Sequence, residues 1–87
     1  MVTIIDFYAD WCGPCQIISP TLERLEGEYA GKIKVEKVNV DQDQTRTQQA
    51  GVMSIPTLVM MKDGKEINRK VGLATEPVLK SWIDANL

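Results

Sequence analysis

The chain has 87 residues, of which 44% are hydrophobic and 25% are charged, the balance of a globular protein with one modest core. Its net charge of −2 gives no electrostatic reason to expect nucleic acid or a membrane surface as a partner. No apolar run reaches the length of a membrane span, and the segment 2–5 follows Met1 without the charged region of a signal peptide. We therefore expect a single domain over residues 1–87, located in the cytoplasm.

The first half of the chain predicts a strand, a helix and a second strand. Residues 2–8 are apolar and rich in β-branched and aromatic side chains, as in a short buried strand. A helix is predicted over residues 13–29, where apolar residues recur at helical spacing, namely Ile18, Leu22, Leu25 and Tyr29. Residues 33–40 predict the second strand, with successive side chains on opposite faces.

The second half predicts a short helix and a hairpin. Residues 41–50 are polar and are interpreted as a short helix capped by Asp41. Two strands, 57–62 and 66–71, flank Asp63-Gly64, which is a strong hairpin turn signal.

A last helix completes the predicted order β-α-β-α-β-β-α. Thr75 is expected to cap this helix, with Glu76 and Pro77 in its first turn. The first strand, helix and second strand make a right-handed parallel unit, to which the hairpin adds an antiparallel half. With helices on both faces of the sheet, the pattern predicts a three-layer α/β domain.

Both cysteines lie in the segment Trp11-Cys12-Gly13-Pro14-Cys15. Two residues three apart at a helix start have Cβ atoms roughly 5–6 Å apart, which is close to the reach of a disulfide bond. A ring this short stabilises a fold by only roughly 2 kcal/mol, so the bond is better explained as one that is made and broken. The alternative is half of a metal site, but without histidine its other ligands would be carboxylates or come from a second chain.

Four segments together resemble the thioredoxin family, in its order and at its spacing over essentially the whole chain. They are Asp6-Phe7-Tyr8-Ala9-Asp10-Trp11-Cys12-Gly13-Pro14-Cys15, Val38-Asn39-Val40-Asp41, Ile55-Pro56-Thr57 and Val71-Gly72. The resemblance implies a thioredoxin-like α/β fold built on a four-stranded mixed sheet. The strand order that it implies is 33–40, 2–8, 57–62, 66–71.

The activity that the resemblance implies is the reduction of disulfides in other proteins. Cys12 would be the nucleophile, since a helix N-terminus stabilises a thiolate, and Cys15 would resolve the mixed disulfide. No bound cofactor or metal is implied. The oxidised pair would receive electrons from an external thioredoxin reductase-like enzyme, which in this family is usually a flavoprotein that consumes NADPH.

Two ionisable residues match the second chemical step in the family. Asp6 should lie buried beneath the cysteine helix, with a raised pKa that suits it to accept the proton of Cys15. Lys37, facing inward beside Val35, resembles the lysine that partners this aspartate. The alternatives are an Asp6 carboxylate satisfied by backbone donors and a Lys37 side chain that extends to solvent.

The resemblance also implies a substrate groove beside Cys12. Trp11 should line this groove, the alternative being plain packing. The Ile55-Pro56 bond should be cis, the alternative being a proline on an edge strand. The residues expected to bind substrate are Trp11, Gly13, Pro14, Ser54, Ile55, Pro56 and Gly72.

Thioredoxins usually carry a further strand and helix before the segment that begins here at Met1. Without them the strand 33–40 would be an unprotected edge, blunted somewhat by Lys34, Glu36 and Lys37. We still expect a monomer in dilute solution.

Two other functions stay open at this point. One is a disulfide oxidase or isomerase, although related families with those activities commonly have histidine between the cysteines, where this chain has Gly13-Pro14. The other is a non-enzymatic module that uses the same loops to grip a partner protein.

Overall fold

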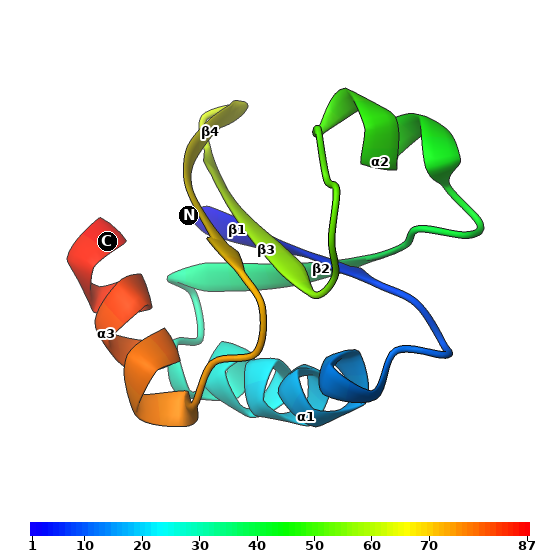
Figure 1. Ribbon diagram of the computed structural model, residues 1–87. Coiled ribbons are helices and arrows are strands. Elements are labelled where there is room, and N and C mark those ends of the chain that lie inside the picture. Colours follow the sequence, from blue (N-terminus) through cyan, green and yellow to red (C-terminus); the bar gives the residue numbers. More distant parts are fainter.

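Seven elements follow one another in the order β-α-β-α-β-β-α in the computed structural model, which describes residues 1–87 (Figure 1). They are β1 (Val2–Tyr8), α1 (Gly13–Glu28), β2 (Ile33–Asn39), α2 (Gln44–Gln49), β3 (Thr57–Lys62), β4 (Lys65–Val71) and α3 (Glu76–Asn86). This order confirms the prediction from the sequence. The bounds agree closely everywhere except at α2, which is shorter than expected.

The sheet has the strand order β2-β1-β3-β4 that the resemblance implied. β1 runs parallel to β2, in a register that pairs Asp6 with Lys37, and antiparallel to β3. β3 and β4 form the expected antiparallel hairpin across Asp63 and Gly64. Both turn residues have positive φ angles, 54° and 78°, which is the backbone that a tight hairpin turn requires and that Asp and Gly tolerate.

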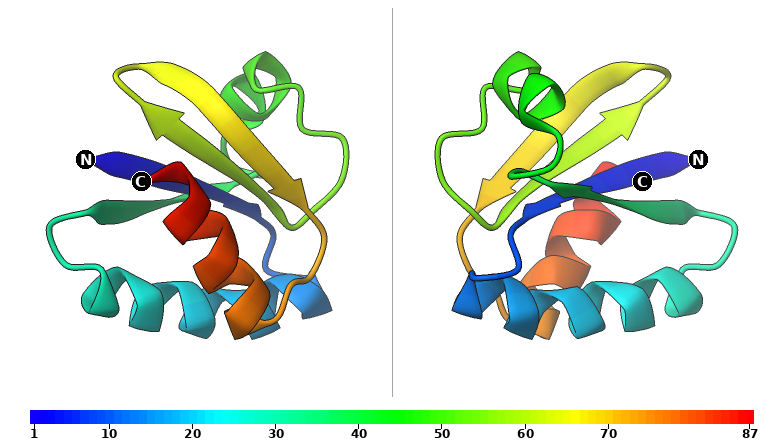
Figure 2. Two further views of the ribbon diagram at one scale, coloured as in Figure 1. Left: turned by 90° about the vertical axis from the view of Figure 1, so that its left-hand side faces the viewer. Right: turned by 90° about the vertical axis from the view of Figure 1, so that its right-hand side faces the viewer.

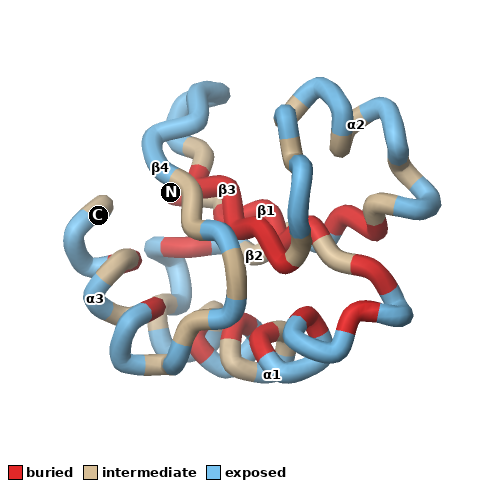
Figure 3. The backbone as a smooth tube through the Cα atoms, viewed as in Figure 1, coloured by how far each residue is buried: buried red, intermediate tan, exposed pale blue.

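Helices cover both faces of the sheet, and successive residues of β1 point to opposite faces. Figure 2 shows α1 and α3 on one side and α2 on the other. The larger apolar cluster fills the layer next to α1 and α3, and its buried members are Val2, Ile4, Ile18, Leu22, Leu25, Ile33, Leu58, Met60, Leu79 and Ile83. A smaller cluster on the α2 side consists of Ile5, Phe7, Val38 and Val59. Burial is concentrated in the central strands (Figure 3).

The start of α2 differs from the prediction. Asp43, and not Asp41, caps the helix, with its carboxylate accepting the backbone N–H of Arg46 at 3.1 Å. The helix begins late because the amides of Gln42 and Asp43 both donate to the carbonyl of Asn39 and form a turn first. Thr75 does occupy the N-cap position of α3, but its hydroxyl makes no capping hydrogen bond.

The edge strand β2 is less open than the sequence suggested. The carboxylate of Glu26, on α1, accepts the backbone N–H of Val35 at 2.6 Å. The N–H of Ile33 donates to the carbonyl of Tyr29, and the carbonyl of Asn39 is occupied by the turn before α2. These contacts take up polar groups that an added strand would need for pairing.

Candidate functional site

The two cysteines lie where β1 passes into α1. Cys12 has an extended backbone and is the N-cap residue, and Pro14 occupies the first turn, where its missing N–H costs nothing. The Cα atoms of Cys12 and Cys15 are 5.3 Å apart and a disulfide bond joins their side chains. The Sγ atom of Cys12 also accepts the backbone N–H of Cys15 at 3.2 Å. In the reduced protein this N–H and the helix dipole favour the thiolate of Cys12.

Both cysteines are buried in the disulfide form. Cys12 is 5% exposed and Cys15 is 1% exposed, so Cys12 is the more exposed of the two although the difference is small. Together with Ala9 they form a small apolar cluster, against which Ile55 packs from the loop before β3. Cys12 is thus the residue of the pair that lies slightly closer to the surface.

In the reduced protein we expect iodoacetamide at neutral pH to label Cys12 first. The physical reasons are the N–H donor at its sulfur and its greater exposure, and we expect a preference of about tenfold over Cys15. Mass spectrometry of peptides after brief labelling measures the ratio. A Cys15→Ser variant serves as the control and should label at the rate of wild-type Cys12. Preferential labelling of Cys15 would reverse the two roles.

Asp6 is completely buried, and neither of its carboxylate oxygens has a hydrogen-bond partner in the protein. The alternative, a carboxylate satisfied by backbone donors, is therefore wrong. Burial raises the pKa of Asp6 from 3.8 to about 6, an effect that the positive charge of Lys37 opposes. The prediction of a buried Asp6 with a raised pKa is confirmed.

Lys37 lies beside Asp6 in the sheet but forms no ion pair with it. Its ammonium donates to the Ser19 hydroxyl at 2.6 Å and lies 4.8 Å from the centroid of the Tyr8 ring. As a residue Lys37 is exposed, so it does not face fully inward. The two contacts of its ammonium nevertheless keep the side chain from extending freely into solvent. Ser19 has no role in the sequence prediction, because nothing in the spacing of the motif pointed to it.

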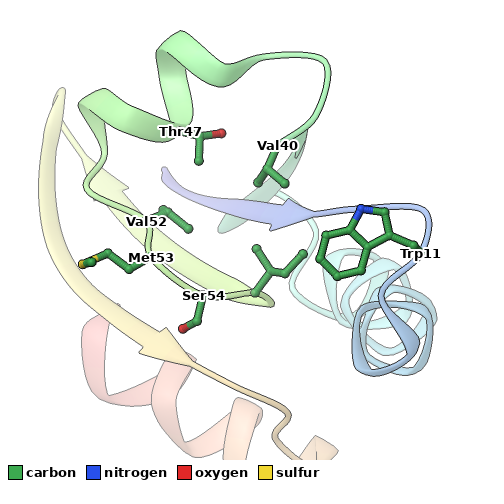
Figure 4. Close-up of a pocket in the computed structure, with 7 residues that line it drawn as sticks. Trp11, Val40, Thr47, Val52, Met53 and Ser54 are labelled. Atoms are coloured by element: carbon green, nitrogen blue, oxygen red, sulfur yellow. The ribbon is translucent and has the colours of Figure 1, made fainter.

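An apolar groove of about 370 Å³ opens beside Trp11, the residue that precedes Cys12 (Figure 4). Trp11, Ser54 and Ile55, all expected to bind substrate, line it. The groove also has four lining residues that the sequence prediction missed, Val40, Thr47, Val52 and Met53. Met53 is 98% exposed. The only sequence signal for it was its position directly before Ser54, a residue expected to bind substrate.

Trp11 is a surface residue and not part of the core. It is 71% exposed, and its Nε1–H donates to the carboxylate of Asp41 at 2.8 Å. This contact is the structural role of Asp41, in place of the helix cap that the sequence suggested. The hydrogen bond ties one wall of the groove to the turn after β2.

The Ile55-Pro56 peptide bond is cis, as predicted. Pro56 is buried and precedes the inner strand β3, so the alternative of an edge-strand proline is wrong. Its carbonyl accepts the N–H of Gly72 at 2.8 Å, which brings Gly72 next to the loop before β3. Gly72 has a φ of 92°, a conformation that favours glycine. Gly13 and Pro14 are exposed in the first turn of α1, outside the groove lining.

No group of three or more His, Cys, Asp or Glu side chains is arranged to hold a metal ion. None of the helices has the length and hydropathy that crossing a membrane requires.

A family model described as Thioredoxin matches residues 1–85. The chain is 43% identical over 84 residues to a thioredoxin of Haemophilus influenzae, covering 97% of this chain and 78% of that protein. A thioredoxin of Pseudomonas aeruginosa is 42% identical over 84 residues, with the same coverage. A thioredoxin of Bacillus subtilis is 42% identical over 86 residues, which are 99% of this chain and 83% of the relative.

Proposed function

The chain belongs to the thioredoxin family, and on that premise we propose that it reduces disulfide bonds of other proteins through Cys12 and Cys15. The protein is a thiol–disulfide oxidoreductase, as its thioredoxin relatives and its cysteine pair indicate. The observation that carries the proposal is the disulfide at the N-terminus of α1, where the Cys12 sulfur accepts a backbone N–H.

The reaction transfers two electrons from the dithiol to the substrate. The Cys12 thiolate attacks one sulfur of the substrate disulfide, the S–S bond of the substrate breaks, and its other sulfur leaves as a thiolate. Cys15 then loses its proton and attacks the sulfur of Cys12. The mixed disulfide breaks, the second substrate sulfur leaves, and the Cys12–Cys15 disulfide remains.

Asp6 is the proposed acceptor of the Cys15 proton. A base works best when its pKa is close to the working pH, and burial raises the pKa of Asp6 to about 6. Lys37 is the proposed electrostatic partner of Asp6, since the two residues are paired in register across β1 and β2.

The proposed substrate site is the groove beside Cys12. Trp11, Ser54 and Ile55 line this groove, and we propose that they contact an extended segment of the substrate. Pro56 and Gly72 lie at the adjoining loop. Gly13 and Pro14 place no cationic side chain between the cysteines. The reduced form therefore gains no extra stabilisation there, which favours a reductant over an oxidase or isomerase.

The oxidised pair needs an electron source, because the chain has no nucleotide-binding motif of its own. We propose an external thioredoxin reductase-like enzyme for this step. A reducing role fits a compartment in which thiols are kept reduced, and we propose the cytoplasm. We also propose that the protein acts as a monomer, since the contacts of Glu26 and Tyr29 occupy part of the β2 edge.

Reduction of insulin by dithiothreitol tests this function. The wild-type protein should accelerate insulin precipitation, and Cys12→Ser should leave only the rate of dithiothreitol alone. Ser81→Ala, at an exposed position on α3, is the matched control and should behave as wild type. Acceleration by Cys12→Ser, or none by the wild type, would contradict the proposal. If the wild type does not accelerate precipitation, retained binding of a partner protein by a Cys12→Ser/Cys15→Ser variant would indicate a non-enzymatic binding module.

A further inference from the structure

The Lys37 ammonium is held by two groups, neither of which is a carboxylate. Ser19, on α1, accepts a hydrogen bond from Nζ at 2.6 Å, and the Tyr8 ring lies 4.8 Å from the same atom. Ser19 is half-buried and lies four residues after Cys15, so both residues share the helix face that packs on the sheet. The side chain that anchors Lys37 is thus on the same helix as the resolving cysteine.

We infer that Ser19 is a positioning residue, whose hydroxyl holds the Lys37 ammonium beside buried Asp6 instead of letting it move out to solvent. The inference rests on the proposed function, in which Asp6 accepts a proton from Cys15. Without an anchor a lysine ammonium on a flexible stem moves toward water, and Lys37 is already an exposed residue. The Ser19 hydroxyl is a neutral acceptor, so it fixes the position of the charge without cancelling it.

The position of this charge matters because Asp6 is buried without hydrogen bonds. An opposite charge within about 4–6 Å lowers a carboxyl pKa by about 1–3, whereas burial raises it. At Asp6 burial is the larger effect and the Lys37 charge is the smaller one. A Lys37 ammonium in direct contact would stabilise the carboxylate further, and one free in solvent would stabilise it less. Held by Ser19, it leaves Asp6 able to take up and release a proton close to neutral pH.

Among the charged groups on the elements packed around this layer, only Lys37 acts on the pKa of Asp6. β3 and α3 bring buried apolar residues to this layer, Leu58, Met60 and Leu79. α1 brings Ser19, the two cysteines and Glu26, whose carboxylate is engaged by the backbone N–H of Val35. β1 itself brings Tyr8, whose ring contacts Lys37. In the oxidised protein the cysteines do not titrate, so this form isolates the effect of Lys37 on Asp6.

Titration of the Asp6 carboxyl carbon by NMR in the oxidised protein tests the inference. Ser19→Ala should raise the pKa of Asp6 by about 0.5, and Lys37→Met should raise it by about 1. The double variant should match Lys37→Met, because Ser19 acts only through the lysine. Ser19→Thr retains a hydroxyl and should restore the wild-type pKa. Ser81→Ala, on the exposed side of α3, should change nothing.

The inference is overturned if Ser19→Ala leaves the pKa of Asp6 unchanged or lowers it. It is equally overturned if Ser19→Ala raises that pKa as much in the Lys37→Met background as in the wild type. A structural defect at Ser19 would predict this last result, since it would not depend on the lysine charge. The titration needs no substrate, so its outcome is separate from the insulin assay that tests the proposed function.

Activity provides a second readout. If Asp6 accepts the Cys15 proton, the Ser19→Ala variant should lose about twofold in kcat at pH 6 and nothing at pH 8, because Asp6 is then fully ionised in both proteins. KM should be unchanged, since Ser19 does not line the substrate groove. An altered NMR titration with an unaltered pH profile would retain Ser19 as the anchor and reject Asp6 as the base.

Discussion

Replacing Cys15 with serine should lower turnover with a disulfide substrate by more than about 10³-fold, while the first chemical step survives. Cys12 keeps its place as the N-cap of α1 and still attacks the substrate disulfide. The thiol that resolves the mixed disulfide is gone, and serine is too weak a nucleophile to replace it. Cys15 is 1% exposed, and serine is close to it in size, so we expect the fold to be retained.

The observable product of this variant is a trapped complex. On a non-reducing gel, about one equivalent of substrate should remain linked to Cys12, and mass spectrometry should locate the link. Cys12→Ser is the control and should form no adduct. Continued turnover by Cys15→Ser, or an adduct on Cys12→Ser, would show that the two roles have been assigned the wrong way round.

Replacing Asp6 with asparagine should raise the free energy of unfolding by about 2–3 kcal/mol at pH 7. Burial raises the pKa of Asp6 from 3.8 to about 6, so the unfolded chain ionises more easily than the folded one. Each pKa unit corresponds to about 1.4 kcal/mol, and the penalty on folding grows as the pH rises from about 4 to about 6. Above that range it is constant, and below it Asp6 is protonated in both states.

Urea unfolding of both proteins over the range from pH 3.5 to pH 8 measures this effect. The gain in free energy of unfolding of Asp6→Asn over the wild type should nearly vanish at the acidic end and reach its plateau above about pH 6. Asp10→Asn is a matched control, since Asp10 is an exposed aspartate near the same site. Asp6→Ala should also be more stable than wild type at pH 7. A gain in free energy of unfolding that does not change with pH would contradict the raised pKa of Asp6.

The stabilised Asp6→Asn variant should nevertheless be a slower reductase. Loss of a positioned proton acceptor typically costs about 10²- to 10⁴-fold in the step it assists. We expect resolution of the mixed disulfide by Cys15 to slow accordingly at pH 7, with the attack by Cys12 unchanged. Single-turnover kinetics separate the two steps. Unchanged turnover in Asp6→Asn would remove Asp6 from the mechanism.

Features that depend on neighbouring residues were predictable from the sequence. The apolar, β-branched run in β1, the helical spacing in α1 and the Asp63-Gly64 turn each depend on a few adjacent residues. The pairing of Cys12 with Cys15 belongs to the same class, since three residues at a helix start set their separation. The position of Asp6 inside an apolar strand, together with the family resemblance, predicted its burial and the raised pKa that follows.

Contacts between residues distant in the sequence were decided only by the tertiary structure. Asp41 binds Trp11, thirty positions away, because the turn made by the carbonyl of Asn39 delays the start of α2 and leaves Asp41 outside the helix. Lys37 binds Ser19 because the packing of α1 on the sheet brings the two side chains together.

The tertiary structure likewise decided the contacts of the edge strand and the lining of the groove. Glu26 reaches the backbone of Val35 only because α1 lies against β2. Met53 lines the groove because the loop before β3 lies opposite Trp11. Sequence spacing determines which face of its own helix or strand a side chain occupies. It does not determine which side chain of another element it meets, because that depends on how the elements pack, and here packing decided the partners of Trp11, Lys37 and Glu26.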